Sequence, residues 1–167
     1  MTTAIQLLNG VKALKKELQN IGISVKHRLE YEYRINIDDV VNDEKLRKSV
    51  RKLFEDGHHA EAVEKAYKFL NNLVKRRANL TPARDGADLM KRTFSANSPI
   101  LRLNAGVTQS EQDEQLGYME IFAGVMTGIR NPRAHEDEWE DQEYRALQLL
   151  MLADHLVDRV RNSVKEH

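Results

Sequence analysis

The sequence predicts a mainly α-helical protein, an antiparallel bundle of four or five helices preceded by a helix and a possible β-strand. Apolar residues recur every three or four positions over most of the chain, which is the period of an amphipathic helix. A single segment, residues 23–38, shows the period of two that is typical of a strand. A length of 167 residues suits one domain with an appendage. We therefore expect a helix-and-strand appendage at residues 1–38 and a helical domain at residues 39–167.

The appendage begins with a helix over residues 3–20, with apolar residues at helical spacing and Gly22 as its stop. Residues 23–38 then alternate between apolar and polar side chains, which favours a strand over an amphipathic helix. A lone strand leaves backbone groups unpaired. We therefore expect this segment to fold back on itself or to pair with the same segment of a second chain.

The bundle helices follow from apolar periodicity and from their stop and start signals. Gly57 marks the end of one helix, and the run from Ser110 to Asp113 resembles a capping box that opens another. The expected helices cover residues 40–54, 58–78, 86–94, 110–129 and 142–163, and residues 95–109 are expected to form a loop.

Three glycines, Gly117, Gly124 and Gly128, interrupt the helix expected at residues 110–129. Glycine within a helix costs about 1 kcal/mol relative to alanine. Their presence predicts close approach by a neighbouring backbone, either in the packed core or at the seam of a dimer.

Charge and composition exclude several classes of protein. Lys plus Arg and Asp plus Glu number 26 each, which argues against bulk electrostatic coating of nucleic acid but allows a small basic cleft. The acidic residues between Glu136 and Glu143 are expected to be solvated and to favour the start of the last helix. The chain has no cysteine and no apolar run that could span a bilayer. We expect a cytoplasmic protein without a membrane segment.

The chemistry concentrates in the hexapeptide Arg130-Asn131-Pro132-Arg133-Ala134-His135. A guanidinium can hold a phosphate in a bidentate fork, and an imidazole can move protons near neutral pH. Pro132 predicts a turn, so Arg130 would end one helix, His135 would precede the next, and both could point to one site. Arg133 would point elsewhere and could add a second phosphate contact. The structural alternative is that Arg130 and His135 only cap their helices.

Other polar residues are weaker candidates. His58 begins a helix and could reach the site, and Glu136 could tune His135, although both are equally expected as surface groups. His155 lies on an apolar face and is expected in the core or at an interface. Trp139 and Tyr144 could form a docking patch or peripheral core. The spacing of histidines and carboxylates predicts no metal site, and no cofactor motif is present.

The hexapeptide and its flanks resemble the HEPN superfamily of ribonucleases and toxins, and within it the Ymh branch. The resemblance covers residues 45–160 and leaves out residues 1–40. It is carried by the segments Leu53–His58, Ala62-Val63, Asp85–Met90, Glu114–Met119, Phe122–Gly124 and Gly128–Glu136.

The resemblance implies a HEPN-like helical bundle that cleaves RNA without metal, from a cleft shared by two subunits. It assigns His135 as general acid or base, Arg130 as the group that stabilises the phosphorane, and Asn131 as the group that orients the pair. Further candidates for contact with the substrate are Arg133, His58 and Glu136. The implied partners are RNA, a second copy of the chain, and an antitoxin or other defence-system protein. The alternative is a silent dimer that binds a protein or nucleotide and regulates a defence enzyme.

Overall fold

The structure, a computed structural model, describes residues 10, 12–14, 16–18, 20, 36–80, 82–136 and 138–166. The chain forms two units, Met1–Arg34 and Ile35–His167, and each is considered by itself. In the first unit the described residues are helical, in agreement with the helix expected at residues 3–20. Most of the expected strand, residues 23–35, lies outside the described residues.

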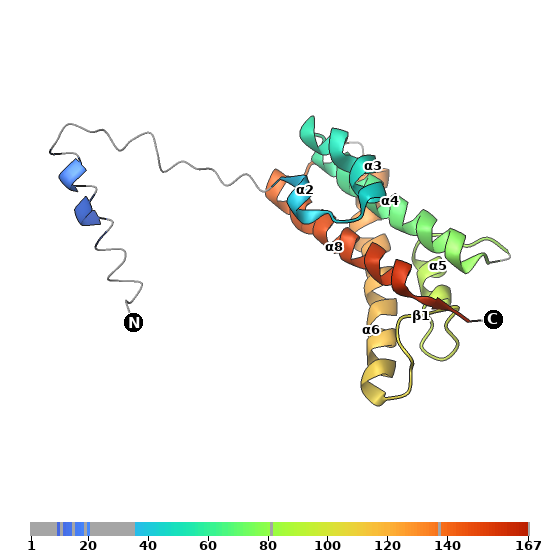
Figure 1. The fold of residues 1–167 in the computed structure, drawn as a ribbon. Coiled ribbons are helices and arrows are strands. Elements are labelled where there is room, and N and C mark those ends of the chain that lie inside the picture. Colours follow the sequence, from blue (N-terminus) through green and yellow to red (C-terminus); the bar gives the residue numbers. More distant parts are fainter. Residues whose placement is uncertain are drawn as a thin grey trace. The chain divides into compact units, whose positions relative to one another are not determined.

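The second unit is a helical bundle, as the sequence predicted (Figure 1). Its helices are α2 (Ile37–Val40), α3 (Glu44–Glu55), α4 (His59–Ala78), α5 (Gly86–Thr93), α6 (Gln109–Val125), α7 (Asn131–His135) and α8 (Glu143–Asn162). A π-helix, η2 (Met126–Arg130), joins α6 to α7, and strands β1 (Leu101–Arg102) and β2 (Val164–Lys165) pair antiparallel. The bounds of α4, α5 and α8 lie within one residue of those expected.

The end of the expected strand is in fact helical, because Ile37 and Asp38 belong to α2. The side chain of Asn36 accepts a hydrogen bond from the Asp38 N–H at 3.2 Å, and the Asp39 carboxylate accepts one from the Asn36 N–H at 3.1 Å. This reciprocal capping box stabilises a single helical turn. Ile37 is buried, as the alternating pattern predicted, but it is buried by a helical turn and not by a strand.

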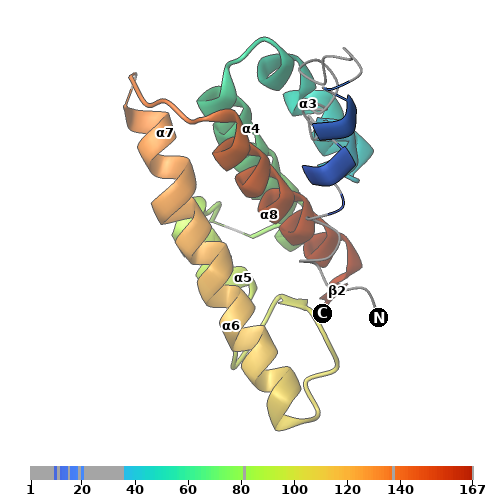
Figure 2. The same cartoon turned by 90° about the vertical axis from the view of Figure 1, so that its left-hand side faces the viewer.

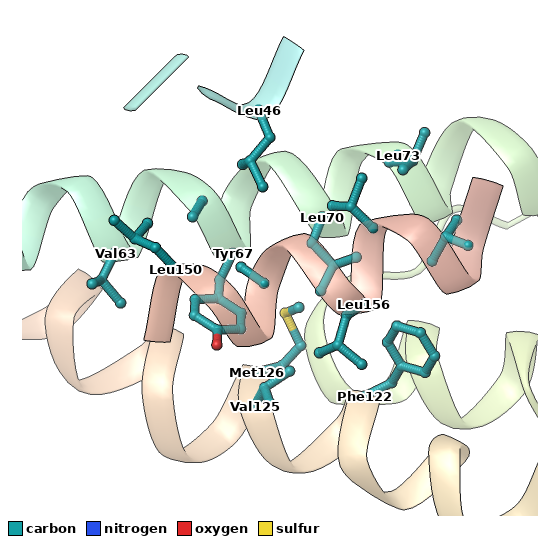
Figure 3. Close-up of a cluster of buried hydrophobic side chains, with 14 of the residues drawn as sticks. Leu46, Val63, Tyr67, Leu70, Leu73, Phe122, Val125, Met126, Leu150 and Leu156 are labelled. Atoms are coloured by element: carbon teal, nitrogen blue, oxygen red, sulfur yellow. The ribbon is translucent and has the colours of Figure 1, made fainter. Parts of the chain in front are cut away.

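The core lies where α4 and α8 pack against the α6–η2 helix (Figure 3). Tyr67 and Leu70 of α4 meet Leu150 and Leu156 of α8, and Met126 of η2 closes the cluster. The Tyr67 hydroxyl donates to the Leu149 carbonyl at 2.9 Å, which satisfies a buried polar group. Burial raises the pKa of Tyr67 far above its ordinary value, although the nearby Arg133 charge opposes the shift.

Residues 95–109 hold more structure than the expected loop. Strand β1 lies within them and pairs with β2, with Leu101 opposite Lys165 and Arg102 opposite Val164. The buried side chain of Gln115 donates to the Phe94 and Leu101 carbonyls at 3.0 and 3.2 Å and accepts from the Leu103 N–H at 2.9 Å. One α6 side chain therefore fixes the path of this segment.

No other element of the described part of the chain covers the glycines of α6 and η2. A β-carbon built on Gly117, Gly124 or Gly128 meets no described atom within 4 Å apart from its chain neighbours and the nearby backbone of its own helix. The expected tight packing within the core is therefore wrong at all three positions. A seam between two chains stays a prediction. Figure 2 shows α6 and α7 as one continuous rod along an edge of this unit.

None of the described helices is both long and apolar enough to cross a membrane.

Candidate functional site

The hexapeptide is helical, which corrects the turn expected at Pro132. Asn131 has helical dihedrals (φ −64°, ψ −43°), although a residue before proline normally avoids them. Pro132 lies in the first turn of α7, and the preceding turn is a π-helix in which the Asn131 N–H bonds to the Met126 carbonyl. We attribute the tolerance of proline to this wider turn, which relieves the clash between the ring and the carbonyl four residues earlier.

Arg130 and Asn131 are held together at the junction of η2 and α7. The Arg130 guanidinium donates from Nη1 to Asn131 Oδ1 at 3.1 Å, and its Nε is buried without a partner among the described residues. His135 follows Asn131 by four residues, so both side chains lie on the same face of α7. His135 is exposed and Asn131 is half-buried. The three expected catalytic residues thus come from two successive turns of one rod.

Arg133 points away from this face and is buried. Its guanidinium forms two bonds with the Asp141 carboxylate, at 2.5 and 2.7 Å, and donates to the Ile129 carbonyl at 2.7 Å. The two side chains are 2% and 0% exposed, and the Trp139 ring lies 5.4 Å from the guanidinium carbon. Arg133 therefore has a structural role and is not accessible to a substrate. Asp141 was expected to be solvated, and its burial corrects that interpretation.

His58 lies away from the hexapeptide face. It lines a hollow of about 630 Å³ between the start of α4 and residues 138–141. The hollow is lined by Gly57, His58, His59, Ala60, Glu61, Glu138, Trp139, Glu140 and Asp141. His58 Nδ1 lies 3.5 Å from the Glu61 carboxylate, and none of Arg130, Asn131 and His135 lines this hollow. The structure does not bring His58 to the hexapeptide face.

Glu136 ends α7 and is exposed, with its N–H bonded to the Pro132 carbonyl at 3.0 Å. It directly follows His135 but makes no side-chain bond to a described residue. His155 was expected in the core or at an interface. It is exposed, and its Nε2 lies 2.6 Å from the Tyr118 hydroxyl.

Two features of the site were missed from the sequence. The π-turn that sets the rotation of α7 had no recognised signal beyond Gly128 and Pro132. The Arg133–Asp141 pair joins residues on either side of a loop. Asp141 lies in a run of acidic residues, so nothing in the sequence indicated that it is buried. No cluster of three His, Asp or Glu side chains suited to a metal ion occurs in the described part of the chain.

A sequence model for a family described as protein of unknown function, Hypoth_Ymh, matches residues 41–160. The chain belongs to the Hypoth_Ymh family. The matched region contains α3 to α7 and all but the end of α8, so the whole hexapeptide lies inside it. Searches of curated proteins and of solved structures gave no match.

Proposed function

We propose that this Hypoth_Ymh protein is a metal-independent endoribonuclease of the HEPN type that cleaves RNA at a site shared by two chains. The observation that carries the proposal is the exposed α7 face, where Asn131 and His135 stand one turn apart and the Arg130 guanidinium bonds to Asn131. The resemblance of the hexapeptide and its flanks to HEPN ribonucleases supports the same assignment.

The chemistry uses groups present on this face. The RNA 2′-hydroxyl attacks the adjacent phosphorus, a P–O bond forms, and the bond to the 5′-oxygen breaks. The products are a 2′,3′-cyclic phosphate and a 5′-hydroxyl. One proton leaves the 2′-oxygen and one reaches the 5′-oxygen, and His135 performs one of these transfers. Arg130 stabilises the charge of the pentacoordinate phosphorane, and Asn131 holds the guanidinium in place. DNA lacks the attacking hydroxyl and should stay intact.

A second chain completes this scheme. Proton removal and proton delivery occur at opposite sides of an in-line displacement, whereas the α7 face of one chain offers a single histidine. A second copy of His135 would supply the other transfer. The uncovered Gly128, together with Ile121, which is 45% exposed, forms part of the surface on which we expect the two chains to meet.

The central test is RNA cleavage by the purified protein in excess EDTA. We expect His135→Ala and Arg130→Ala each to lower the rate by about 100-fold or more, the usual contribution of such groups. Arg76→Ala, a change at an exposed arginine outside the hexapeptide, should leave the rate unchanged. Circular dichroism should show that all variants are folded. Products ending in a 2′,3′-cyclic phosphate would identify the reaction.

Intact RNA at high protein concentration would contradict the enzyme and favour the silent dimer that regulates a partner. The mass of the particle is a separate test. Light scattering should give about twice the chain mass of 19.3 kDa. If the protein is a monomer and still cleaves RNA, the shared site is wrong but the ribonuclease activity stands.

A further inference from the structure

A groove of about 470 Å³ runs between α5 and the α6–η2 rod. Its lining combines small or flexible side chains with two charged ones, Lys91 and Glu120. The groove is lined by Ala87 and Lys91 of α5, by Met119, Glu120, Ala123 and Gly124 of α6, and by Thr127 of η2. The volume suits one nucleotide, since ligand pockets generally measure about 300–1,000 Å³.

The groove and the hexapeptide face lie on the same α6–η2–α7 rod. Ala123 and Thr127 line the groove, and Asn131 and His135 follow them on the same rod at intervals of four residues. Residues so spaced lie on neighbouring parts of one helix face. With a rise of at most about 1.5 Å per residue, Thr127 lies within about 6 Å of Asn131 along the axis. A strand held at Asn131 and His135 would therefore enter the groove within a few nucleotides.

Two charged groups of opposite sign give the groove a recognition chemistry. Lys91 and Glu120 are both exposed, and neither forms an ion pair with another described residue. A carboxylate accepts two parallel hydrogen bonds, and an ammonium donates to a carbonyl or ring nitrogen. Guanine offers this complement, since its N1–H and N2–H₂ donors adjoin the O6 acceptor. The apolar floor, with Met119, suits the flat face of a base.

We propose that the α5–α6 groove binds a guanine base close to the cleaved bond, with Glu120 accepting from its N1–H and N2–H₂ and Lys91 donating to its O6. This inference rests on the proposed ribonuclease function and adds the base that the enzyme selects. A base seated here would hold the RNA so that the neighbouring phosphate lies at Arg130 and His135.

The test compares three short RNAs that differ at one base: guanosine, inosine, which lacks the N2 amino group, or adenosine. Wild-type protein should cleave the guanosine RNA about tenfold faster than the adenosine RNA, with inosine between them. Glu120→Gln has only one carbonyl acceptor and should cleave guanosine and inosine RNAs equally. Lys91→Met, which keeps the aliphatic stem, should lower cleavage of the guanosine RNA. Equal rates on all three RNAs with wild type would overturn the guanine site while leaving the ribonuclease intact.

A second variant fills the groove without threatening the fold. Gly124→Leu places a side chain in open space and replaces glycine with a better helix former, so the helix should remain stable. We expect it to abolish the guanine preference. Gly117→Leu, on the same helix but outside the groove, is the matched control and should retain the preference. Light scattering on both variants separates a filled groove from a broken dimer.

Binding provides a readout that does not require cleavage. Fluorescence anisotropy with His135→Ala protein should show tighter binding of the guanosine RNA than of the inosine RNA, and Glu120→Gln should remove the difference. If wild type cuts no RNA but this difference persists, the base site stands and the catalytic proposal fails. If the His135→Ala protein binds the three RNAs equally, the base site is wrong.

Discussion

At the scale of single residues, the two arginines of the hexapeptide have opposite roles. Arg130 carries its guanidinium to Asn131 on the half-exposed side of the rod, whereas Arg133 lies buried against Asp141. The sequence predicted that Arg133 would point away from Arg130 and could add a second phosphate contact. It did not predict the burial of Arg133, because residue type alone does not show which face of a helix is covered. Arg130 ends the π-turn, whereas Arg133 lies in α7, where its side chain packs against Asp141.

The Arg133–Asp141 pair should be essential to stability. Asp141→Ala leaves a buried guanidinium without its counter-charge, so we expect a loss of about 3–5 kcal/mol in the free energy of unfolding. Urea denaturation followed by circular dichroism measures it. Replacing both partners by apolar residues, Arg133→Met with Asp141→Leu, should recover much of the loss because no unpaired charge remains.

Arg145 offers a matched control for this prediction. Its Nε lies 3.6 Å from the same Asp141 carboxylate, but its side chain is 63% exposed. Water screens such a pair, and we expect Arg145→Ala to cost less than about 1 kcal/mol. Equal losses in Asp141→Ala and Arg145→Ala would show that burial does not govern this cluster.

At the scale of elements, the start of α6 offers two possible N-cap residues, and the structure shows which one is used. Thr108 and Ser110 are each followed three residues later by an acidic residue. The structure uses Thr108, whose hydroxyl accepts from the Glu111 N–H at 3.2 Å. The Glu111 carboxylate accepts from the N–H groups of Thr108 and Val107, and these bonds lower the pKa of Glu111. The capping box expected at Ser110 is therefore wrong by two positions.

The two hydroxyl residues give a matched pair of variants. Thr108→Ala removes the cap and should cost about 1 kcal/mol in the free energy of unfolding. Ser110→Ala lies within the first turn, makes no such cap, and should be close to neutral. Thermal melting followed by circular dichroism compares them. A larger loss from Ser110→Ala would contradict the observed start of α6.

The features that the sequence predicted depend on residues close together in the chain, whereas one that it missed joins residues far apart. Helices α4, α5 and α8 depend on periodicity within a few turns, so their bounds were predictable. The pairing of β1 with β2 joins Leu101 to Lys165, which a local pattern cannot show. Arg130 and His135 were proposed as site residues from their residue types and the family resemblance, and Asn131 from the resemblance alone. The π-turn beneath them was not predicted, because a one-residue widening leaves the apolar pattern almost unchanged.

At the scale of the whole molecule, residues near the two ends of the helical unit are tied together by charged and polar contacts. Asp154 of α8 accepts from the Asp43 N–H at 2.8 Å and from the Asn42 side chain at 3.2 Å. The Asp43 carboxylate in turn pairs with Arg161 at the end of α8 and caps α3 by accepting from the Leu46 N–H at 2.9 Å. These contacts fix the α2–α3 connection against the last helix (Figure 1).

This junction should make the fold sensitive to acid. Partial burial raises the pKa of Asp43, but the hydrogen bond and charge of Arg161 and the backbone N–H groups of Leu46 and Lys45 outweigh it and lower the pKa below 3.8. A carboxyl whose pKa is depressed on folding stabilises the protein above its unfolded pKa and loses this effect as the pH falls through the folded pKa. We therefore expect the contribution of Asp43 to be complete at neutral pH and to decline as the pH falls below about 4.

Asp43→Asn isolates the charge, because asparagine is an equally good N-cap but cannot pair with Arg161. At pH 7 we expect it to be less stable than wild type by about 0.5–1 kcal/mol, since Arg161 is partly exposed and water screens the pair. In urea denaturation at pH 3 the difference should shrink toward zero. Arg161→Ala should show the same convergence, and the double variant should lose no more than either single one. A difference independent of pH would mean that Asp43 acts through capping alone.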